Sequence, residues 1–436
     1  MARLERNKLI KTALFIGLAM HFYEATARAH RGLVQTEAPA IFDVTKFGAK
    51  GEGKAVLDED GNPENNFAFM RAWNEACKTP GPAKVVIPPG NFVISQVLFA
   101  GPCKCPNPVV EVQGTLTAST DLSLYPSPEW IMFERVDGAT LTGSGTFHAH
   151  GEVNWKSNDC KTNPDCVNLP ASIKFHRANN SVMENIKSVN SMFFHVFVTF
   201  CHNVTIRNVT LEAPDDSPNT DGIHTSRSDQ VTITDSIIAT GDDCVSVGQG
   251  SRNISVSGVT CGPGHGLSVG SLGKDADEMP VRFVHIKNCT LKGTDNGARV
   301  KTRVGRIVNE ASDIIFEDLI MDHVHNPIII DQQYGSKKKK KAAAGLVSQV
   351  KVSNVAFRNI RGTSTTNTIV NLICSPKIPC EGIEVADIDL KPMPLKGVAQ
   401  TQSACTNAKV KFGGKHDGLT CDGIAATSAT EDAIDA

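Results

Sequence analysis

The chain has 436 residues, of which 40% are hydrophobic and 21% are charged. It is too apolar for a disordered protein, and its 36 Gly lack the every-third-residue spacing of collagen. Its 44 Lys and Arg nearly balance 46 Asp and Glu, which leaves no general basic surface, so we expect no nucleic-acid partner.

The first 29 residues have the pattern of a secretory signal peptide. A basic lead is followed by the apolar run 12–20, and Ala27 and Ala29 occupy the small-residue positions before a cleavage site. The apolar run is about half of the ~20 residues that span a bilayer. No later stretch approaches that length, so we expect a secreted, extracellular mature chain (30–436) that does not cross a membrane.

Residues 66–78 predict a helix. Phe67, Met70, Trp73 and Cys77 recur at helical spacing, and the segment lacks the alternation of a strand. We expect this helix to cap the N-terminal end of the β-structure that follows, with Trp73 in its core.

A repeated strand pattern organises the second half of the chain. Each unit is a short β-branched run, apolar-x-apolar-x-x-apolar or a shortened form of it, followed by turn residues. Successive units start 27, 23, 30, 30, 36 and 33 residues apart. The units begin at Val204, Val231, Ile254, Val284, Ile314, Val350 and Ile383.

Strand repeats of this length without helices between them predict an all-β, single-stranded parallel β-helix. A sandwich would need hairpin turns, which rarely separate these strands, and propeller blades would need longer repeats. Weaker units at 109–112 and 139–141 place the first coil near residue 85. We therefore expect one domain over 30–436, with its core at about 40–425 and a frayed tail after Cys421.

Four polar residues recur at the repeat spacing. Asp221 and Asp242 are 21 residues apart, and Asp243 and His265 are 22 apart. Positions one coil apart stack at roughly 4.8 Å, so the carboxylates and the imidazole should meet on one face. Crowded carboxyls raise the pKa of one member while the others stay ionised. Glycoside hydrolysis needs such a pairing of acid and base.

Cations follow this cluster in the chain. Arg299 and Lys301 lie on one face of a strand, on either side of Val300, and Tyr334 follows one long coil later. Cations beside carboxylates suit a sugar substrate that itself carries carboxylates. The lysine run 337–341 is either a solvated loop or a further polyanion-binding patch.

These polar residues also fit less specific roles. Each Asp-Gly or Asn-Thr-Asp taken alone fits a solvated turn or an Asn/Asp stack, and the cluster could bind calcium through oxygen ligands. The Gly-rich stretch 262–273 has neither the spacing nor the following helix of a nucleotide-binding loop.

The 13 cysteines all follow the signal peptide, so we expect mostly disulfides, with at least one thiol unpaired. Spacing favours Cys160–Cys166, Cys374–Cys380 and Cys405–Cys421. A zinc site is not expected, because no CxxC or HxxxH pair occurs. Potential glycosylation sequons begin at Asn179, Asn203, Asn208, Asn253 and Asn288.

Four motifs carry a family resemblance. They are SPNTDGIH at 217–224, GDDC at 241–244, CGPGHG at 261–266 and RVK at 299–301. Together, in this order, they resemble the signatures of the polygalacturonases, the pectin-hydrolysing glycoside hydrolase family 28. The likeness runs from Phe42 to about residue 422, and the chain is similar overall to plant pollen-type exopolygalacturonases.

The resemblance implies a right-handed, pectin-lyase-like β-helix, in the cell wall, that hydrolyses α-1,4-galacturonosidic bonds with inversion. It implies that Asp242 is the general acid, that Asp221 and Asp243 hold and deprotonate the attacking water, and that His265 supports the acid. Substrate-binding roles fall to Asn219, Arg299, Lys301 and Tyr334. It implies no metal or organic cofactor, and it adds the disulfide Cys244–Cys261. We expect a monomer that acts on polygalacturonate or its oligomers.

Two departures from the family pattern stand out. Val300 replaces Ile in the fourth motif and should be silent, whereas Gly335 and the lysine run stand where relatives often have cysteines. The polar segment 154–169 breaks the strand repeat and is a candidate groove wall, which favours exo action over endo action. Two further alternatives are a calcium-dependent pectate lyase and a catalytically silent pectin-binding wall protein.

Overall fold

The computed structural model describes residues 38–55, 64–160, 163, 166–335, 346–393, 400–416 and 418–421. The predicted signal peptide, the lysine run 337–341 and the tail beyond Cys421 lie outside the described residues. The described residues from Ala40 onward belong to one compact unit. No helix among the described residues is long and apolar enough to cross a membrane.

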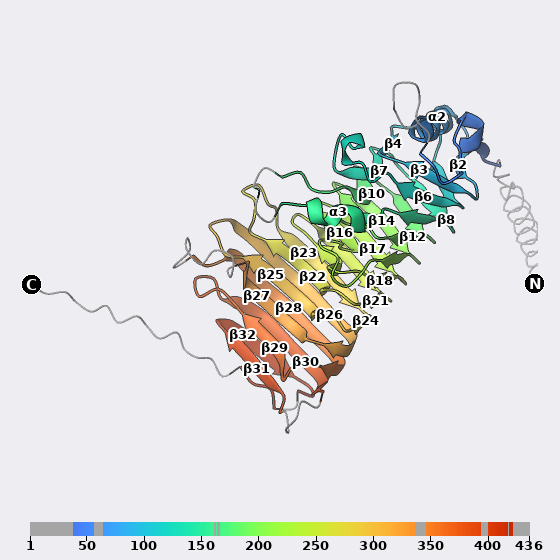
Figure 1. The fold of residues 1–436 in the computed structure, drawn as a ribbon. Coiled ribbons are helices and arrows are strands. Elements are labelled where there is room, and N and C mark those ends of the chain that lie inside the picture. The colour runs from blue at the N-terminus through green and yellow to red at the C-terminus, as the bar shows by residue number, and fades with distance from the viewer. Residues whose placement is uncertain are drawn as a thin grey trace, which may run out of the picture. The chain divides into compact units, whose positions relative to one another are not determined.

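Strands form two parallel sheets, one of 11 and one of 21 strands (Figure 1). The 11-stranded sheet contains β4 (Val97–Ala100), β7 (Glu129–Glu134), β10 (Ala171–His176), β13 (Val196–Thr199), β16 (Ile223–Ser226), β19 (Asp243–Val247), β22 (Gly266–Leu272), β25 (Asn296–Arg303), β27 (Asn326–Tyr334), β29 (Thr368–Ile373) and β31 (Gln402–Thr406).

The 21-stranded sheet consists of two stacks that merge where longer strands run through both. The first stack is β1 (Ala40–Asp43), β2 (Ala83–Ile87), β5 (Val109–Val112), β8 (Thr140–Gly143), β11 (Ser181–Glu184), β14 (His202–Arg207), β17 (Asp229–Thr234), β20 (Arg252–Ser257) and β23 (Val281–Lys287). The second is β3 (Asn91–Ile94), β6 (Thr115–Ala118), β9 (Thr146–His148), β12 (Lys187–Val189), β15 (Thr210–Glu212), β18 (Ile237–Ala239), β21 (Thr260–Cys261) and β24 (Thr290–Lys292). The merging strands are β26 (Val308–Val324), β28 (Gln349–Ser364) and β30 (Cys380–Pro392), and β32 (Ala408–Gly413) continues the first stack beyond β30.

One coil of the chain contributes one strand to the 11-stranded sheet and two to the other sheet. Thus β13, β14 and β15 pair in parallel with β16, β17 and β18 of the next coil. This arrangement is a parallel β-helix, as the repeat predicts. The repeat pattern falls on the 21-stranded sheet, and it does not reveal the third strand of each coil.

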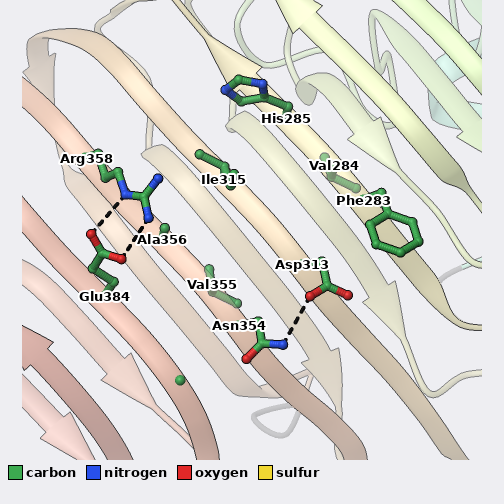
Figure 2. Close-up of a pocket in the computed structure, with 11 residues that line it drawn as sticks. Phe283, Val284, His285, Asp313, Ile315, Asn354, Val355, Ala356, Arg358 and Glu384 are labelled. Carbon is green, nitrogen blue, oxygen red and sulfur yellow. Dashed lines mark hydrogen bonds and ion pairs between the residues drawn. The ribbon is translucent and has the colours of Figure 1, made fainter.

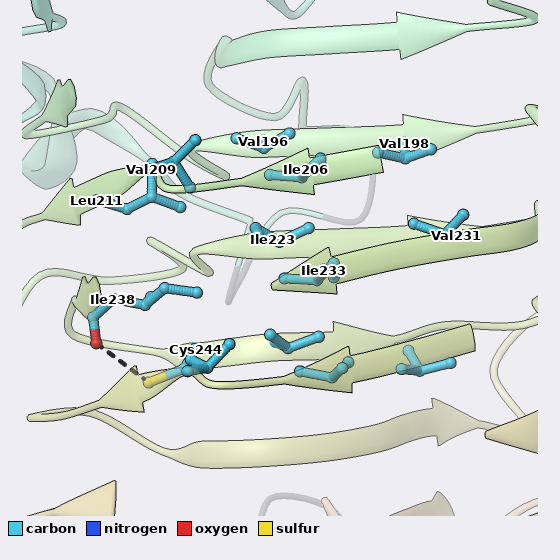
Figure 3. Packing of buried hydrophobic residues seen from close by; sticks show 14 of the residues in the cluster. Val196, Val198, Ile206, Val209, Leu211, Ile223, Val231, Ile233, Ile238 and Cys244 are labelled. Carbon is cyan, nitrogen blue, oxygen red and sulfur yellow. Dashed lines mark hydrogen bonds between the residues drawn. The ribbon is translucent and has the colours of Figure 1, made fainter. Parts of the chain in front are cut away.

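The core is a column of stacked aliphatic side chains. In the coils of Figure 3, Val196 pairs in register with Ile223 and Val204 with Val231, and each of these side chains is fully buried. Alternate residues of each strand point inward, so the column grows by a few buried aliphatic groups per coil. Full burial of such a side chain is worth about 1.5–3 kcal/mol.

Asparagines at left-handed turn positions form a second type of stack. Asn203 and Asn208 have φ of 56° and 50°, and their amides donate to Asn180 and Asn185 of the previous coil at 2.7 and 2.6 Å. Asn tolerates this backbone conformation better than most residues. Asn253 does the same, with φ of 52° and a hydrogen bond to Asp229 at 2.7 Å, so three of the five sequon asparagines have a structural role in the turns. Their glycosylation stays a prediction.

The predicted capping helix is α2 (Glu64–Lys78), next to β2, β3 and β4 (Figure 1). Trp73 is fully buried and its indole donates to the Ala100 carbonyl at 2.9 Å, which confirms its place in the core. On the same helix Phe69 is also fully buried, whereas Phe67 is 39% exposed. Short helices elsewhere are η1 (Val44–Phe47), η2 (Leu122–Leu124), α3 (Gly151–Asn154) and η3 (Trp155–Ser157).

The first coil begins before residue 85, because β1, which precedes the capping helix in the chain, already pairs with β2, which follows it. All four expected disulfides are present, and Cys77–Cys103 is an additional one that spacing did not indicate. The unpaired thiols are three buried cysteines, Cys105, Cys201 and Cys289.

Candidate active site

The predicted site residues meet at one edge of the 11-stranded sheet. Asp221 precedes β16, Asp242 and Asp243 stand at the start of β19, and His265 precedes β22. Asp243 pairs with Gly266 of the next coil. Gly266 has φ of 86°, and a Cβ there would lie 1.9 Å from the Asn296 carbonyl oxygen, so only glycine fits this turn.

A row of polar side chains runs across the coils beside the carboxylates. In register, Phe197 of β13 is followed by His224, Ser246, Ser268 and Arg299. The Ser246 hydroxyl donates to Asp221 at 2.6 Å, and the Ser268 hydroxyl donates to Asp243 at 2.8 Å. Each serine therefore fixes a carboxylate of the coil before its own.

Asp243 is the ionised member of the cluster. It is 1% exposed, and its oxygens accept hydrogen bonds from Arg299 and from Lys301, the latter at 2.6 Å. Burial alone would oppose its charge, but the two cations and the hydrogen bonds from Lys301 and Ser268 outweigh burial and lower the pKa of Asp243 to about 2.

Asp221 has the opposite electrostatic environment. Burial raises the pKa of Asp221 well above its usual value, and the charges of Asp242 and Asp243 raise it further. Lys301 and Ser246 only partly oppose this rise. The pKa values of two carboxyls of one cluster are thus shifted in opposite directions, which is what paired acid and base chemistry requires.

Asp242 and His265 form a pair at the mouth of the cluster. His265 Nδ1 lies 2.8 Å from Asp242 Oδ1, which also accepts from the Asp243 backbone N–H at 2.8 Å. The hydrogen bond to Asp242 raises the pKa of His265 despite its partial burial. The Asp242 side chain is 18% exposed, the most accessible of the three carboxyls.

A groove of about 740 Å³ opens over this cluster. Asn219, Lys301 and Tyr334 line it, as their predicted substrate-binding roles require, and Tyr334 lies under the cations of Lys301 and Arg303 at 5.2 and 5.4 Å. Arg299 does not line the groove, because its guanidinium is taken up by Asp243 and Ser268.

The predicted wall segment 154–169 borders the same groove. Trp155, Asn158, Cys160 and Asn168 line it, next to the aromatic residues Phe193, Phe194 and Phe197. These side chains belong to coils that precede the carboxylates in the chain, so they bound the groove on its N-terminal side.

Sequence reasoning missed three residues that organise the site, namely His224, Ser246 and Ser268. His224 bonds to Ser246 through Nδ1 at 2.6 Å and stacks on Phe194 with ring centroids 4.6 Å apart. Burial lowers the pKa of His224 to about 4. The signal was present, because Ser246 and Ser268 are one coil apart, at the spacing of Asp243 and His265.

The buried cations beside this cluster disfavour the binding of a metal ion there. Asp242, Asp243 and His265 offer ligand atoms within 4.8 Å of one another. Both oxygens of Asp243 already accept from a buried cation, and a calcium ion would have to lie beside these charges. The residues therefore fit chemistry without a metal better than a calcium site.

A second hollow, of about 450 Å³, lies on the 21-stranded sheet (Figure 2). Strands β23, β26, β28 and β30 provide its lining, which includes Phe283, Ile315 and Ala356. Its charged groups are paired side by side across the strands, as Arg358 with Glu384.

The family model of the glycosyl hydrolases family 28 matches residues 77–415, and the chain belongs to this family. An exopolygalacturonase of Arabidopsis thaliana is 47% identical over 88% of this chain and 89% of its own length. A polygalacturonase of Gossypium hirsutum is 42% identical over 89% of this chain and 92% of its own length.

Solved structures show the same fold. An exopolygalacturonase from Thermotoga maritima superposes with a TM-score of 0.69 at 18% identity, covering 86% of this chain and 91% of its own. An endo-xylogalacturonan hydrolase from Aspergillus tubingensis gives 0.71 at 21% identity, covering 86% and 100%. At these identities the likeness is one of fold.

Proposed function

We propose that this protein is a secreted exo-polygalacturonase that hydrolyses α-1,4-galacturonosidic bonds of de-esterified pectin. The observation that carries the proposal is the split cluster, in which two cations lower the pKa of Asp243 while burial raises the pKa of Asp221. Lys301 is one of these two cations and also lines the groove, where it can bind a galacturonate carboxylate. The Arabidopsis and Gossypium relatives, named as polygalacturonases, support the same substrate.

In this mechanism Asp242 protonates the leaving glycosidic oxygen. It is the carboxyl most open to the groove, and the imidazole of His265 holds its side chain in place. Because the carboxyls are coupled, the proton of the free enzyme belongs to the cluster, and Asp242 is the member placed to deliver it. When the shared proton is on Asp242, Asp221 is ionised, and Asp221 and Asp243 orient the attacking water and accept its proton, with Asp243 supplying the permanent negative charge.

Inversion of the anomeric centre is part of this proposal and rests on the family resemblance. Asp242 and Asp243 have oxygens within 4.8 Å of each other, which is shorter than the ~6.5–9.5 Å usual for inverting enzymes. Proton NMR of the first product formed from a galacturonate oligomer tests it. The α-linked substrate should yield the β-anomer first, and the α-anomer would refute inversion.

Exo action is proposed because the groove is walled on its N-terminal side. Trp155, Asn158 and Phe194 line the groove and belong to coils that precede the carboxylates, and in this proposal they close that end to a longer substrate. Viscosity of polygalacturonate should therefore fall slowly as reducing ends accumulate. A steep fall after only a few per cent of the bonds are cut would establish internal cleavage.

The proposal also states that the enzyme is secreted, monomeric and built as a single domain. Five disulfides in the described residues suit an oxidising compartment. Cleavage after Ala29 can be checked by N-terminal sequencing of the exported protein, and the monomer by light scattering. A mature protein that begins at Met1 would refute the signal peptide.

One experiment separates this function from a lyase and from a silent binding protein. Reducing sugar released from polygalacturonate is measured with and without EDTA, together with ultraviolet absorbance of the products. A hydrolase releases sugar without absorbance, a calcium-dependent lyase gives absorbance that EDTA abolishes, and a silent pectin-binding protein gives neither. Either of the last two outcomes would refute the proposal.

A further inference from the structure

A cluster of nitrogen and oxygen ligands lies outside the active site, where β9 leads into α3. His148 is the last residue of β9, His150 precedes α3, and Glu152 lies within it. One ligand atom from each residue lies within 4.8 Å of the other two. His150 Nδ1 and Glu152 Oε1 are 3.2 Å apart, and the two imidazole rings have centroids 4.0 Å apart.

The backbone brings these side chains together in a defined way. His150 takes a left-handed conformation, with φ of 52°, at the turn into α3. Non-glycine residues seldom adopt this conformation. The following Gly151 packs so closely that a Cβ would lie 2.4 Å from the Ser191 carbonyl oxygen. The turn is therefore tightly fixed, and it holds His150 and Glu152 beside His148.

Two further contacts point to a ligand. Asn190 donates to Glu152 Oε2 at 2.9 Å, and Oε1 faces His150. A hydrogen-bond partner of this kind commonly orients a carboxylate that binds a metal. The Nδ1 atom of His148 is buried and has no hydrogen-bond partner among the described residues.

We propose that His148, His150 and Glu152 bind a divalent transition-metal cation of the zinc type. Two imidazoles and one carboxylate, with a fourth position left for water, form a ligand set that zinc accepts. Calcium and magnesium prefer oxygen ligands and would not select two imidazoles. Zinc bonds of about 2.0–2.2 Å need small side-chain movements to close the cluster, and the pair of His150 and Glu152 is already close.

The bound ion would tie β9 to the start of the groove wall. Trp155 follows α3, its indole donates to the Ser191 carbonyl at 3.0 Å, and it packs against Gly151 between the two ligands. The same Trp155 lines the groove. An ion at this cluster therefore holds the wall in place from behind. The His-x-His spacing was missed at the level of sequence, where only CxxC and HxxxH pairs were considered.

The test uses the full mature chain without a histidine tag, freed of metal by EDTA, dialysed and titrated with Zn²⁺ by calorimetry. We expect one ion per chain. His150→Gln and Glu152→Gln should each weaken binding by at least about tenfold, because each removes one ligand. His202→Gln is the matched control, since His202 and Asp229 form a similar pair at 3.3 Å that belongs to no three-ligand group in the described residues.

Trp155 supplies a local readout. The other tryptophans, Trp73 and Trp130, are buried in the core, so Zn²⁺ should change the emission of Trp155, and Trp155→Phe should abolish the change without abolishing binding. Unchanged affinity in both ligand variants would overturn the proposal. So would loss of binding in Asp242→Asn with retention in His150→Gln, which would place the ion in the active site. These outcomes do not depend on whether the enzyme hydrolyses pectin.

Discussion

The groove and the hollow on the 21-stranded sheet are built by the same stacking rule, yet their charges are arranged differently. In the hollow, Arg358 pairs with Glu384, and both side chains remain 41% and 36% exposed. In the groove, Arg299 pairs with Asp243, and their side chains are 9% and 1% exposed. Arg358 and Glu384 join the neighbouring strands β28 and β30 (Figure 2). Arg299 and Asp243 join β25 and β19, two coils apart.

The second difference is the balance of charge. Asp313 in the hollow accepts from two neutral groups, the amide of Asn354 and the hydroxyl of Ser312. In the groove, Asp243 takes both cations, while Asp221 remains without one as a direct partner. Parallel stacking therefore brings polar side chains together on both faces, but only burial with unequal pairing shifts their pKa values far enough for acid–base chemistry.

The largest effect is expected at the proton donor. Asp242→Asn should lower kcat by about 10²–10⁴-fold with little change in thermal stability, because the amide keeps the shape but cannot donate a proton. Steady-state kinetics on oligogalacturonate measures this. Asp313→Asn, the same change on the opposite sheet, is the control and should leave kcat unchanged. A variant that retains more than about a tenth of wild-type kcat would remove Asp242 from this role.

Next is the buried cation pair. Lys301→Met should lower the free energy of unfolding by about 3 kcal/mol, the low end for a broken buried ion pair, because Arg299 still faces Asp243. We also expect a lower kcat and a higher KM, since Lys301 serves both Asp243 and the groove. Urea unfolding and kinetics measure these effects.

The pH dependence of this loss has a defined sign. The pKa of Asp243 is lowered in the folded protein, so its contribution to stability is present above about pH 4 and is lost as pH falls toward 2. The difference between Lys301→Met and wild type should shrink over that range. A change confined to KM, with unfolding unaltered, would mean that Lys301 serves only the substrate.

A smaller kinetic effect is expected at Ser246. Ser246→Ala removes the hydroxyl that donates to Asp221, and a hydrogen bond to an ionisable group is worth about 1.5–3 kcal/mol, so kcat/KM should fall by about 10–100-fold. Ser226→Ala is the matched control, because its hydroxyl lies in the same groove but donates to Thr199. Equal kinetics in both variants would show that Asp221 needs no donor.

The raised pKa of Asp221 should make the folded protein less stable near neutral pH than a variant without this carboxyl. Its pKa is raised in the folded protein, so its contribution to stability is present below the unfolded value of about 3.9 and is lost as pH rises. Asp221→Asn should therefore gain Tm relative to wild type as pH rises from about 4 to 7, while losing activity. Thermal unfolding at several pH values measures this, with Asp216→Asn as an exposed control. A pH-independent difference would contradict it.

The smallest effect is expected on the opposite sheet. Arg358→Ala should cost only about 0.2–1 kcal/mol of stability, as is usual for exposed ion pairs, and activity should not change. Added salt should reduce even this difference, because exposed charges are screened. A loss comparable to that of Lys301→Met would show that exposure does not distinguish the two sheets.

Much of the fold could be predicted because its main force is regular. Period-two aliphatic residues such as Val204 and Ile206 bury on one side of each strand, and their recurrence gives the coil. The third strand of each coil was not predicted, because β16 and β19 carry polar groove residues that break this alternation. Burial of Phe69 was likewise not predicted, since helical spacing alone does not determine which face of α2 meets the sheet.

The proximity of the carboxylates and His265 could be predicted, because residues one coil apart along the chain lie next to each other in the structure. Their hydrogen bonds could not, because these depend on side-chain direction. Arg299 illustrates the difference, since its strand position is as predicted but its guanidinium turns to Asp243 and away from the groove. Ser246 and Ser268 need the register between strands before their partners can be known.

The register of the 11-stranded sheet has a consequence for how such an enzyme can vary. Val196, Ile223, Val245, Leu267 and Ala298 pair in sequence, although different lengths of chain separate them. The extra residues lie outside the sheet, as in the segment between β22 and β23, where Lys274 and Glu278 line the groove. Insertions there can reshape the substrate-binding walls while the catalytic carboxylates keep their spacing, so substrate preference and chemistry can change independently of each other.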